Sequence, residues 1–146
     1  MKICIVCSDG GHLTEMLQLM EAFDGHETFF ITYNVLGSRD LGKAYTIEIL
    51  KRNPFRYLRV VPIIIRILQR EKPDLIISDG AEIAIPTLYT AKMFGIKIVF
   101  IESWCRITNP SSTGKIIYPI ADVFLVQWEQ LKKKYGRKAE YRGGVF

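Results

Sequence analysis

Several short segments of this chain are rich in consecutive apolar residues, and they alternate with segments whose apolar residues recur every three or four positions. The apolar segments are clearest at 2–7, 74–78 and 96–102. A strand that is apolar on both faces must be covered on both sides, which is typical of parallel sheets between two layers of helices. The pattern predicts an α/β fold with a doubly wound, mainly parallel sheet and helices on both faces.

The same periodicity predicts the order of the elements. Strands are expected at 2–7, 27–33, 45–50, 74–78, 96–102 and 122–126, and helices at 12–23, 55–71, 82–94, 112–119 and 128–135. The polar segments 34–43 and 103–112 are expected to be loops. With 146 residues and no linker or internal repeat, the chain is expected to form a single domain spanning 1–146.

The composition limits the classes of protein to consider. Apolar residues make up 49% and charged residues 24%, which is ordinary for a folded domain. The net charge of +5 suits phosphate groups or an anionic membrane, and it equally suits a solvated surface. No nucleic-acid partner is expected, because the basic residues are not interleaved with aromatic residues on a recognised module. Neither a secretion signal nor an apolar stretch of about 20 residues is apparent.

Cys4 and Cys7 form a C-x-x-C pair inside the first predicted strand. Side chains alternate across a strand, so residues three apart point to opposite faces and cannot share a metal ion or close a redox pair. Three cysteines also make no disulfide framework in a chain of this size. Both are expected to be small buried residues, and the cytosol is the expected compartment.

In doubly wound folds, ligands bind at the carboxyl ends of the strands, so the turns there are informative. The first is Ser8-Asp9-Gly10-Gly11-His12. Paired glycines let the backbone approach a ligand closely, and the N–H groups at a helix start favour an anion. His12 is a candidate phosphate contact or base, or it caps the turn. The alternative for the glycines is a tight turn that needs positive φ.

Two further turns end at the same predicted edge. Asp79, Gly80 and Glu82 follow strand 74–78 and repeat the first turn's combination of small residues and a helix start. Glu102 ends an apolar strand, which is costly unless the carboxylate is paired or lies in a cleft. Arg106 is its expected structural partner.

The predicted helix 55–71 carries a narrow arginine sector beside a wide apolar face. On a helical wheel the sector contains Arg56, Arg59, Arg66 and Arg70. The arginines are expected to face solvent or the headgroups of a membrane surface. Pro62 is expected to kink the helix or to start its second half.

Four motifs, in this order, resemble one known family. They are Asp9-Gly10-Gly11-His12 with Glu15-Met16-Leu17, Glu102-Ser103-x-Cys105-Arg106, Ser112-x-Gly114-Lys115 and Val126-Gln127-Trp128. The chain resembles the acceptor-side, membrane-recruiting subunit of the two-part UDP-N-acetylglucosamine transferase of N-glycan assembly, and its bacterial and archaeal homologues in polysaccharide assembly. The similarity covers nearly the whole chain and is strongest from residue 99 onward.

The resemblance implies the N-terminal lobe of a GT-B glycosyltransferase, with the nucleotide-sugar lobe on a separate catalytic chain. It implies that this chain binds a polyprenyl-diphosphate-linked sugar acceptor and recruits that catalytic chain to the membrane. The implied acceptor and diphosphate site comprises Gly10, Gly11, His12, Asp79, Gly80, Glu82, Glu102 and Arg106. The implied partner-docking surface includes Trp128, Val145 and Phe146, and a frayed C-terminus is the alternative.

The reaction implied is inverting transfer from a UDP-sugar to an acceptor hydroxyl. His12 and Glu102 are the candidate bases. No metal-binding constellation is apparent, so neither a metal nor another cofactor is expected. The eukaryotic subunit begins with a membrane anchor, whereas this chain begins with its first strand. A peripheral location on the cytoplasmic side of the membrane is therefore expected, with helix 55–71 as the contact.

Two other classes of function stay open. A self-contained Rossmann-type nucleotide-binding enzyme would bind a UDP-sugar or dinucleotide without a partner. A pure scaffold would dock the partner without touching the acceptor. The resemblance favours a chain that is inactive alone and gains transferase activity with its partner.

Overall fold

The computed structural model describes residues 1–33 and 41–146. The strands in these residues are β1 Lys2–Val6, β2 Glu27–Tyr33, β3 Ala44–Ile47, β4 Leu75–Ser78, β5 Lys97–Ile101, β6 Val123–Val126 and β7 Ala139–Tyr141. They form one sheet in the order β3-β2-β1-β4-β5-β6-β7, and every neighbouring pair is parallel. The predicted parallel α/β fold is confirmed.

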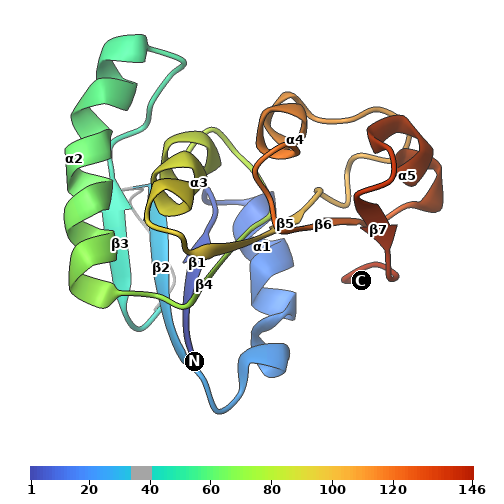
Figure 1. Ribbon diagram of the computed structural model, residues 1–146. Coiled ribbons are helices and arrows are strands. Elements are labelled where there is room, and N and C mark those ends of the chain that lie inside the picture. The colour runs from blue at the N-terminus through green and yellow to red at the C-terminus, as the bar shows by residue number, and fades with distance from the viewer. Residues whose placement is uncertain (34–40) are drawn as a thin grey trace.

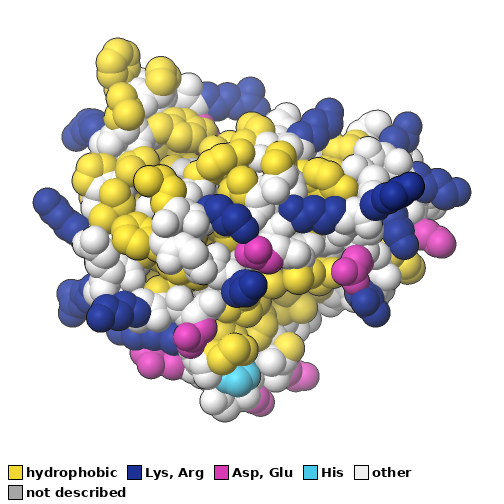
Figure 2. Space-filling view, in the orientation of Figure 1, with side chains coloured by type: hydrophobic (Ala, Val, Ile, Leu, Met, Phe, Trp, Pro, Cys, Tyr) yellow, Lys and Arg dark blue, Asp and Glu magenta, His cyan; other side chains and the backbone are white. Residues whose placement is uncertain are grey.

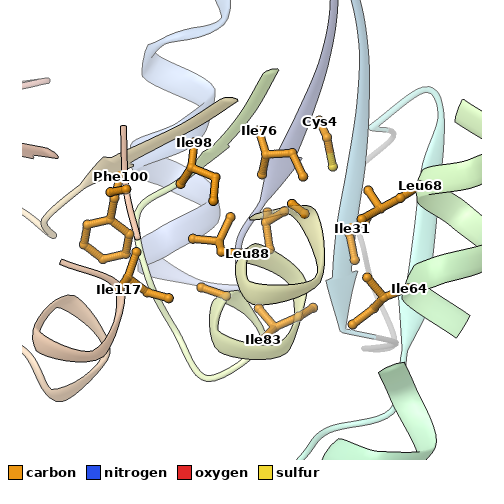
Figure 3. Close-up of a cluster of buried hydrophobic side chains, with 14 of the residues drawn as sticks. Cys4, Ile31, Ile64, Leu68, Ile76, Ile83, Leu88, Ile98, Phe100 and Ile117 are labelled. Carbon is orange, nitrogen blue, oxygen red and sulfur yellow. The ribbon is translucent and has the colours of Figure 1, made fainter. Parts of the chain in front are cut away.

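Helices cover both faces of the sheet (Figure 1). They are α1 Gly11–Gln18, α2 Pro54–Glu71, α3 Ala84–Met93, α4 Ser112–Ile117 and α5 Glu129–Tyr135, with a 3₁₀ helix at Met20–Phe23. One core joins the sheet to α2, α3, α4 and α5, and Figure 3 shows Ile64 and Leu68 of α2 and Leu88 of α3 within it. The other joins the sheet to α1 and the 3₁₀ helix.

Cys4 in β1 and Cys7 directly after it confirm the predicted alternation of side chains. Cys4 lies in the core beneath α2 and α3, whereas Cys7 lies in the core beneath α1. Both side chains are fully buried, and burial raises the pKa of each thiol. They are packing residues on opposite faces.

Some boundaries differ from those expected. The helix predicted at 12–23 ends at Gln18, and a 3₁₀ turn completes the segment. The short edge strand β7 was not predicted, because three residues with one buried side chain give almost no periodic signal. The loop predicted at 34–43 lies mostly outside the described residues, since it includes 34–40.

The expected interruption at Pro62 is wrong. Helix α2 runs from Asn53, whose side chain caps the N–H of Phe55, through Pro62 to Glu71 without a break. Pro62 is exposed, as is Leu58 one turn before it. The carbonyl that loses its helical donor is therefore on the solvent side, where water can bond to it.

The strand order reverses at β1, whose neighbours are β2 and β4. In open parallel sheets, the connections leaving two such strands diverge and open a crevice at the carboxyl edge. Here those connections are the turn before α1 and the turn between β4 and α3. The topology therefore brings the two predicted glycine turns together.

Candidate functional site

A cleft of about 670 Å³ opens at the carboxyl edge of the sheet. Its walls are the start of α1, the turn before α3, the loop after β5 and the start of α4. Of the residues predicted for the site, those that line the cleft are Gly11, His12, Asp79, Gly80, Glu82, Glu102 and Arg106. Gly10 directly precedes this lining. The structure thus brings the three predicted turns to one place.

The two glycine turns differ in what they provide. Gly10 has φ 82° and caps α1, and no side chain bonds to the helix start. A Cβ at Gly11 would meet no atom of the residues that the structure describes within 4 Å. Gly80 has φ 118°, and a Cβ there would lie 3.6 Å from the His12 ring. The first turn leaves backbone N–H groups open to a ligand, whereas the second packs beneath His12.

His12 and Asp79 form the central polar pair of the cleft. Nδ1 of His12 lies 2.9 Å from Oδ2 of Asp79, whose side chain is fully buried, while the His12 side chain is 30% exposed. Bonding through Nδ1 leaves Nε2 for a ligand in the cleft. Oδ1 of Asp79 is buried and has no hydrogen-bond partner within the described residues.

The pKa values of this pair are both raised. Burial raises the pKa of Asp79 to about 6, against the opposing effect of its bond to His12. Burial lowers the pKa of His12, but the bond to Asp79 and the charges of Asp79, Glu15 and Glu102 raise it more, so the net direction is upward. The pair is therefore arranged to hold and release a proton near neutral pH.

Glu102 is paired differently from the prediction. Its Oε2 accepts from the N–H and hydroxyl of Ser111, each at 3.0 Å, and from the hydroxyl of Tyr135. Its Oε1 accepts from the N–H of Ser103 at 3.1 Å. No bond or ion pair within the described part of the chain joins it to Arg106, so that expected pairing is wrong. The carboxylate, 1% exposed, ties the loop after β5 to α4 and α5.

A third buried carboxylate of the site, Glu15 of α1, was missed as an organising residue. It accepts from the Ser103 hydroxyl at 2.8 Å, the Trp104 N–H at 3.0 Å and the Gln127 amide at 3.0 Å. The same Gln127 amide donates to the Glu102 carbonyl. Gln127 directly follows a buried strand, as Glu102 does. A polar residue at such a position was the signal in the sequence that pointed to this network.

Glu82 is held by α2 and the turn before it. It accepts from the backbone N–H of Arg52 and from the hydroxyl of Tyr57, the latter at 2.8 Å. Burial and this bond raise the pKa of Tyr57 well above its ordinary value. Arg52 and Tyr57 also line the cleft, and neither was predicted to do so.

The arginines of α2 lie on its outer side. Arg59, Arg66 and Arg70 are exposed, while Arg56 is half-buried and donates to the Ile49 carbonyl at 2.7 Å. Exposed apolar side chains accompany them, with Phe55 74% and Leu58 71% exposed. Hydrophobic side chains gather over α2 and α3 with basic side chains around them (Figure 2). Among the described helices, none combines the length and hydrophobicity needed to cross a membrane.

The C-terminal residues pack on the chain itself. The Trp104 ring lies 4.5 Å from that of Trp128 and 5.7 Å from that of Phe146. The N–H of Val145 donates to the side chain of Gln127 at 2.9 Å. Phe146 remains 62% exposed. The predicted docking residues thus form one aromatic surface beside the loop that follows β5.

These features define a Rossmann-like α/β lobe of the GT-B type, with a polar cleft at its switch point. Residues 33–145 match the family model described as oligosaccharide biosynthesis protein Alg14 like. The chain belongs to this Alg14-like family.

Two named relatives match this chain over different lengths. The human UDP-N-acetylglucosamine transferase subunit ALG14 is 29% identical over 99% of this chain and 83% of its own length. The subunit of the same name from Schizosaccharomyces pombe is 42% identical over 50% of this chain and 37% of its own length.

Solved structures show the same fold at low sequence identity. MurG of Acinetobacter baumannii superposes with a TM-score of 0.82 at 17% identity, over 99% of this chain and 45% of MurG. The UDP-GlcNAc 2-epimerase of Methanocaldococcus jannaschii gives 0.79 at 15% identity, over 99% of this chain and 46% of the epimerase. The chain thus spans about half the length of these structures.

Proposed function

We propose that this chain is the acceptor-binding half of a two-part glycosyltransferase. In this proposal it binds a polyprenyl-diphosphate-linked sugar, and a separate GT-B lobe supplies the UDP-sugar. The observation that carries the proposal is its match, over 99% of its length, to a protein named as a UDP-N-acetylglucosamine transferase subunit. The chain also shares its fold with 45% of MurG.

His12 is the proposed catalytic base. Asp79 fixes the ring through Nδ1, so Nε2 accepts the proton of the acceptor hydroxyl while its oxygen attacks the anomeric carbon of the donor sugar. Attack from the side opposite the departing UDP inverts the anomeric configuration. Asp79 acts through His12 and is a positioning residue.

Glu102 is proposed to position rather than to accept a proton. Both of its oxygens already accept hydrogen bonds, and its side chain is buried. It would hold the loop that presents Arg106 and Ser103 to the cleft. Of the two candidate bases predicted from sequence, His12 is therefore preferred.

The diphosphate is proposed to bind at the turn before α1. At Gly10 and Gly11 no described residue covers the helix start, and Arg52 and Arg106 line the same cleft. Backbone N–H groups and guanidinium groups are suitable partners for phosphate oxygens. Gly80 and Glu82 would form the opposite wall, with Glu82 holding Tyr57 and the Arg52 backbone in place.

The partner and the membrane are proposed to contact different surfaces. The Trp104–Trp128–Phe146 cluster, with Val145, would dock the nucleotide-sugar lobe, since an exposed aromatic group beside the cleft suits an interface. Arg56, Arg59, Arg66 and Arg70, with the exposed Phe55 and Leu58, would meet anionic headgroups on the cytoplasmic side.

Reconstitution tests the proposal. The chain, a candidate C-terminal-lobe protein from the neighbouring reading frame, or both are mixed with a prenyl-diphosphate-linked N-acetylglucosamine and labelled UDP-sugars. Turnover is expected only with both chains. Turnover by the single chain, or its tight binding of a UDP-sugar, would instead identify a self-contained nucleotide-binding enzyme. If turnover survives the replacement of His12, and this chain shows no affinity for the acceptor, the chain is a scaffold.

A further inference from the structure

A second cavity continues from the cleft and differs from it in chemistry. This groove, of about 550 Å³, lies between the first half of α2 and the first half of α3. Arg52, Tyr57 and Ile85 line both the groove and the cleft. The two spaces therefore adjoin at these residues, which places the groove next to the cleft.

The groove offers almost nothing for a polar ligand to bond. Beyond Arg52, its lining is apolar or aromatic, including Leu58, Val61 and Pro86. Its two tyrosine hydroxyls are used elsewhere, because Tyr57 donates to Glu82 at 2.8 Å and Tyr89 donates to the Ile116 carbonyl at 2.9 Å. Only the rings of these tyrosines remain for an occupant, which must therefore be hydrocarbon.

Arg52 gives the combined cavity an amphiphilic shape. Its backbone is held by Glu82, while its guanidinium forms no ion pair within the described residues. It lies where the polar cleft meets the apolar groove. An anionic group at Arg52 with hydrocarbon attached would satisfy both sides of this junction.

We propose that the groove between α2 and α3 binds the isoprenoid units nearest the diphosphate of the lipid-linked acceptor. The inference rests on the proposed function and adds the path of the lipid. The exposed Leu58 and Tyr89 border the groove on its outer side, at 71% and 41% exposure. The remaining isoprenoid units of the lipid would leave the groove there, toward the hydrophobic surface over α2 and α3 (Figure 2).

Soluble probes separate this groove from simple adsorption to a membrane. Inorganic diphosphate, geranyl diphosphate and farnesyl diphosphate are titrated into the full chain by calorimetry, without lipid and below their aggregation concentrations. Affinity is expected to rise at least about tenfold from inorganic diphosphate to the farnesyl compound, because each buried methylene adds apolar contact.

Two groove variants and one control make the test specific. Leu58→Gln changes an exposed side chain and Val61→Thr is nearly isosteric, so both should fold. Each is expected to lower farnesyl diphosphate affinity about three- to tenfold and to leave inorganic diphosphate binding unchanged. Ile63 lies on the same helix but outside the groove, and it is 43% exposed. Ile63→Gln should therefore change the affinity for neither farnesyl diphosphate nor inorganic diphosphate.

Each other result has a defined meaning. Equal affinity for all three probes, or a tail effect that the groove variants do not alter, overturns the groove and leaves the proposed function standing. Loss of partner binding with unchanged farnesyl affinity in the groove variants would identify the groove as a protein interface and also overturn it. Failure of every probe to bind, even with the partner present, counts against the proposed diphosphate site as well.

Discussion

Two buried carboxylates lie at opposite ends of β4, and their surroundings differ. Glu71, which precedes the strand, forms ion pairs with Lys2 at 2.6 Å and Lys43 at 2.8 Å. It also accepts a hydrogen bond from the hydroxyl of Tyr45. These bonds lower its pKa to about 2 despite its burial. Asp79, after the strand, has only His12 as a side-chain partner and one oxygen with none in the described residues.

The difference separates a structural site from the proposed functional one. At the amino edge of the sheet, three donors make the charged form of Glu71 favourable, so this carboxylate stabilises the fold. At the carboxyl edge, burial raises the pKa of Asp79 to about 6, so its charged form opposes folding at neutral pH. Perturbed, incompletely bonded groups of this kind are typical of functional sites, which supports the role proposed for Asp79.

The largest expected effect comes from replacing His12. In the reconstituted transferase, His12→Gln is expected to lower turnover about 100-fold or more, because it removes the proton acceptor. The other histidine, His26, is exposed and its ring hydrogen-bonds with the N-terminus, so His26→Gln is the matched control and should retain activity. Initial rates at saturating acceptor measure both. Near-normal turnover of His12→Gln would remove His12 as the base.

The fold and part of the candidate site could be predicted from sequence, because they depend on where the strands end. Consecutive apolar residues predicted the parallel sheet, and the known behaviour of such sheets placed both glycine turns and Glu102 at one edge. The wide apolar face of predicted helix 55–71 likewise indicated packing on the sheet, and Val60, Ile64 and Leu68 are buried there, although Leu58 of the same face is exposed. These features depend on local periodicity.

The pairing of the polar residues was not accessible, because it depends on contacts between distant segments. The bond from His12 to Asp79 spans 67 residues, and those from Glu15 to Ser103 and Gln127 span 88 and 112. Nothing in local spacing distinguishes Arg106 from Ser111 as the partner of Glu102. Only the packing of α4 and α5 against β5 and β6 decides it.

Replacing Glu71 tests the structural site at the amino edge of the sheet. Glu71→Gln is expected to destabilise the fold by about 2 kcal/mol at pH 7, a value discounted because Lys2 and Lys43 are partly exposed. Denaturant unfolding measures it. Glu27→Gln is the control, since Glu27 pairs with the same Lys2 but is 60% exposed and should have little effect.

The pH dependence of the same variant sharpens the test. The pKa of Glu71 falls from 4.5 to about 2 on folding, so its contribution is complete above pH 4.5 and is lost as the pH falls toward 2. The native chain should lose this stability in that window, and the Glu71→Gln variant should lack that component. Parallel acid-unfolding curves for the two proteins would contradict the assigned role.

Replacing Asp79 should give the opposite stability effect. Its raised pKa means that ionisation above about pH 6 opposes folding, so Asp79→Asn is expected to stabilise the chain at pH 7, by only about 1 kcal/mol because the amide bonds His12 more weakly than the carboxylate does. Destabilisation at pH 7 would show that the ion pair dominates.

The same variant should shift the pH–rate profile of the transferase. His12 accepts a proton only when neutral, so activity rises with pH through its pKa, which the charges of Asp79, Glu15 and Glu102 raise. Without the charge of Asp79 that pKa falls, and the midpoint should move to lower pH while turnover drops about tenfold. An unmoved midpoint would assign Asp79 a merely structural role.

The smallest expected effect is the loss of one of the three donors to Glu71. Tyr45→Phe removes a hydroxyl from a carboxylate that keeps both lysines, so a cost of about 0.5–1 kcal/mol is expected. The pKa of Glu71 should rise toward its ordinary value, which moves the acid-unfolding midpoint to higher pH. Tyr141→Phe, at a 44% exposed tyrosine, is the control. If Tyr45→Phe destabilised the fold as much as Glu71→Gln, the three donors would not share the stabilisation, and the hydroxyl of Tyr45 would account for most of it.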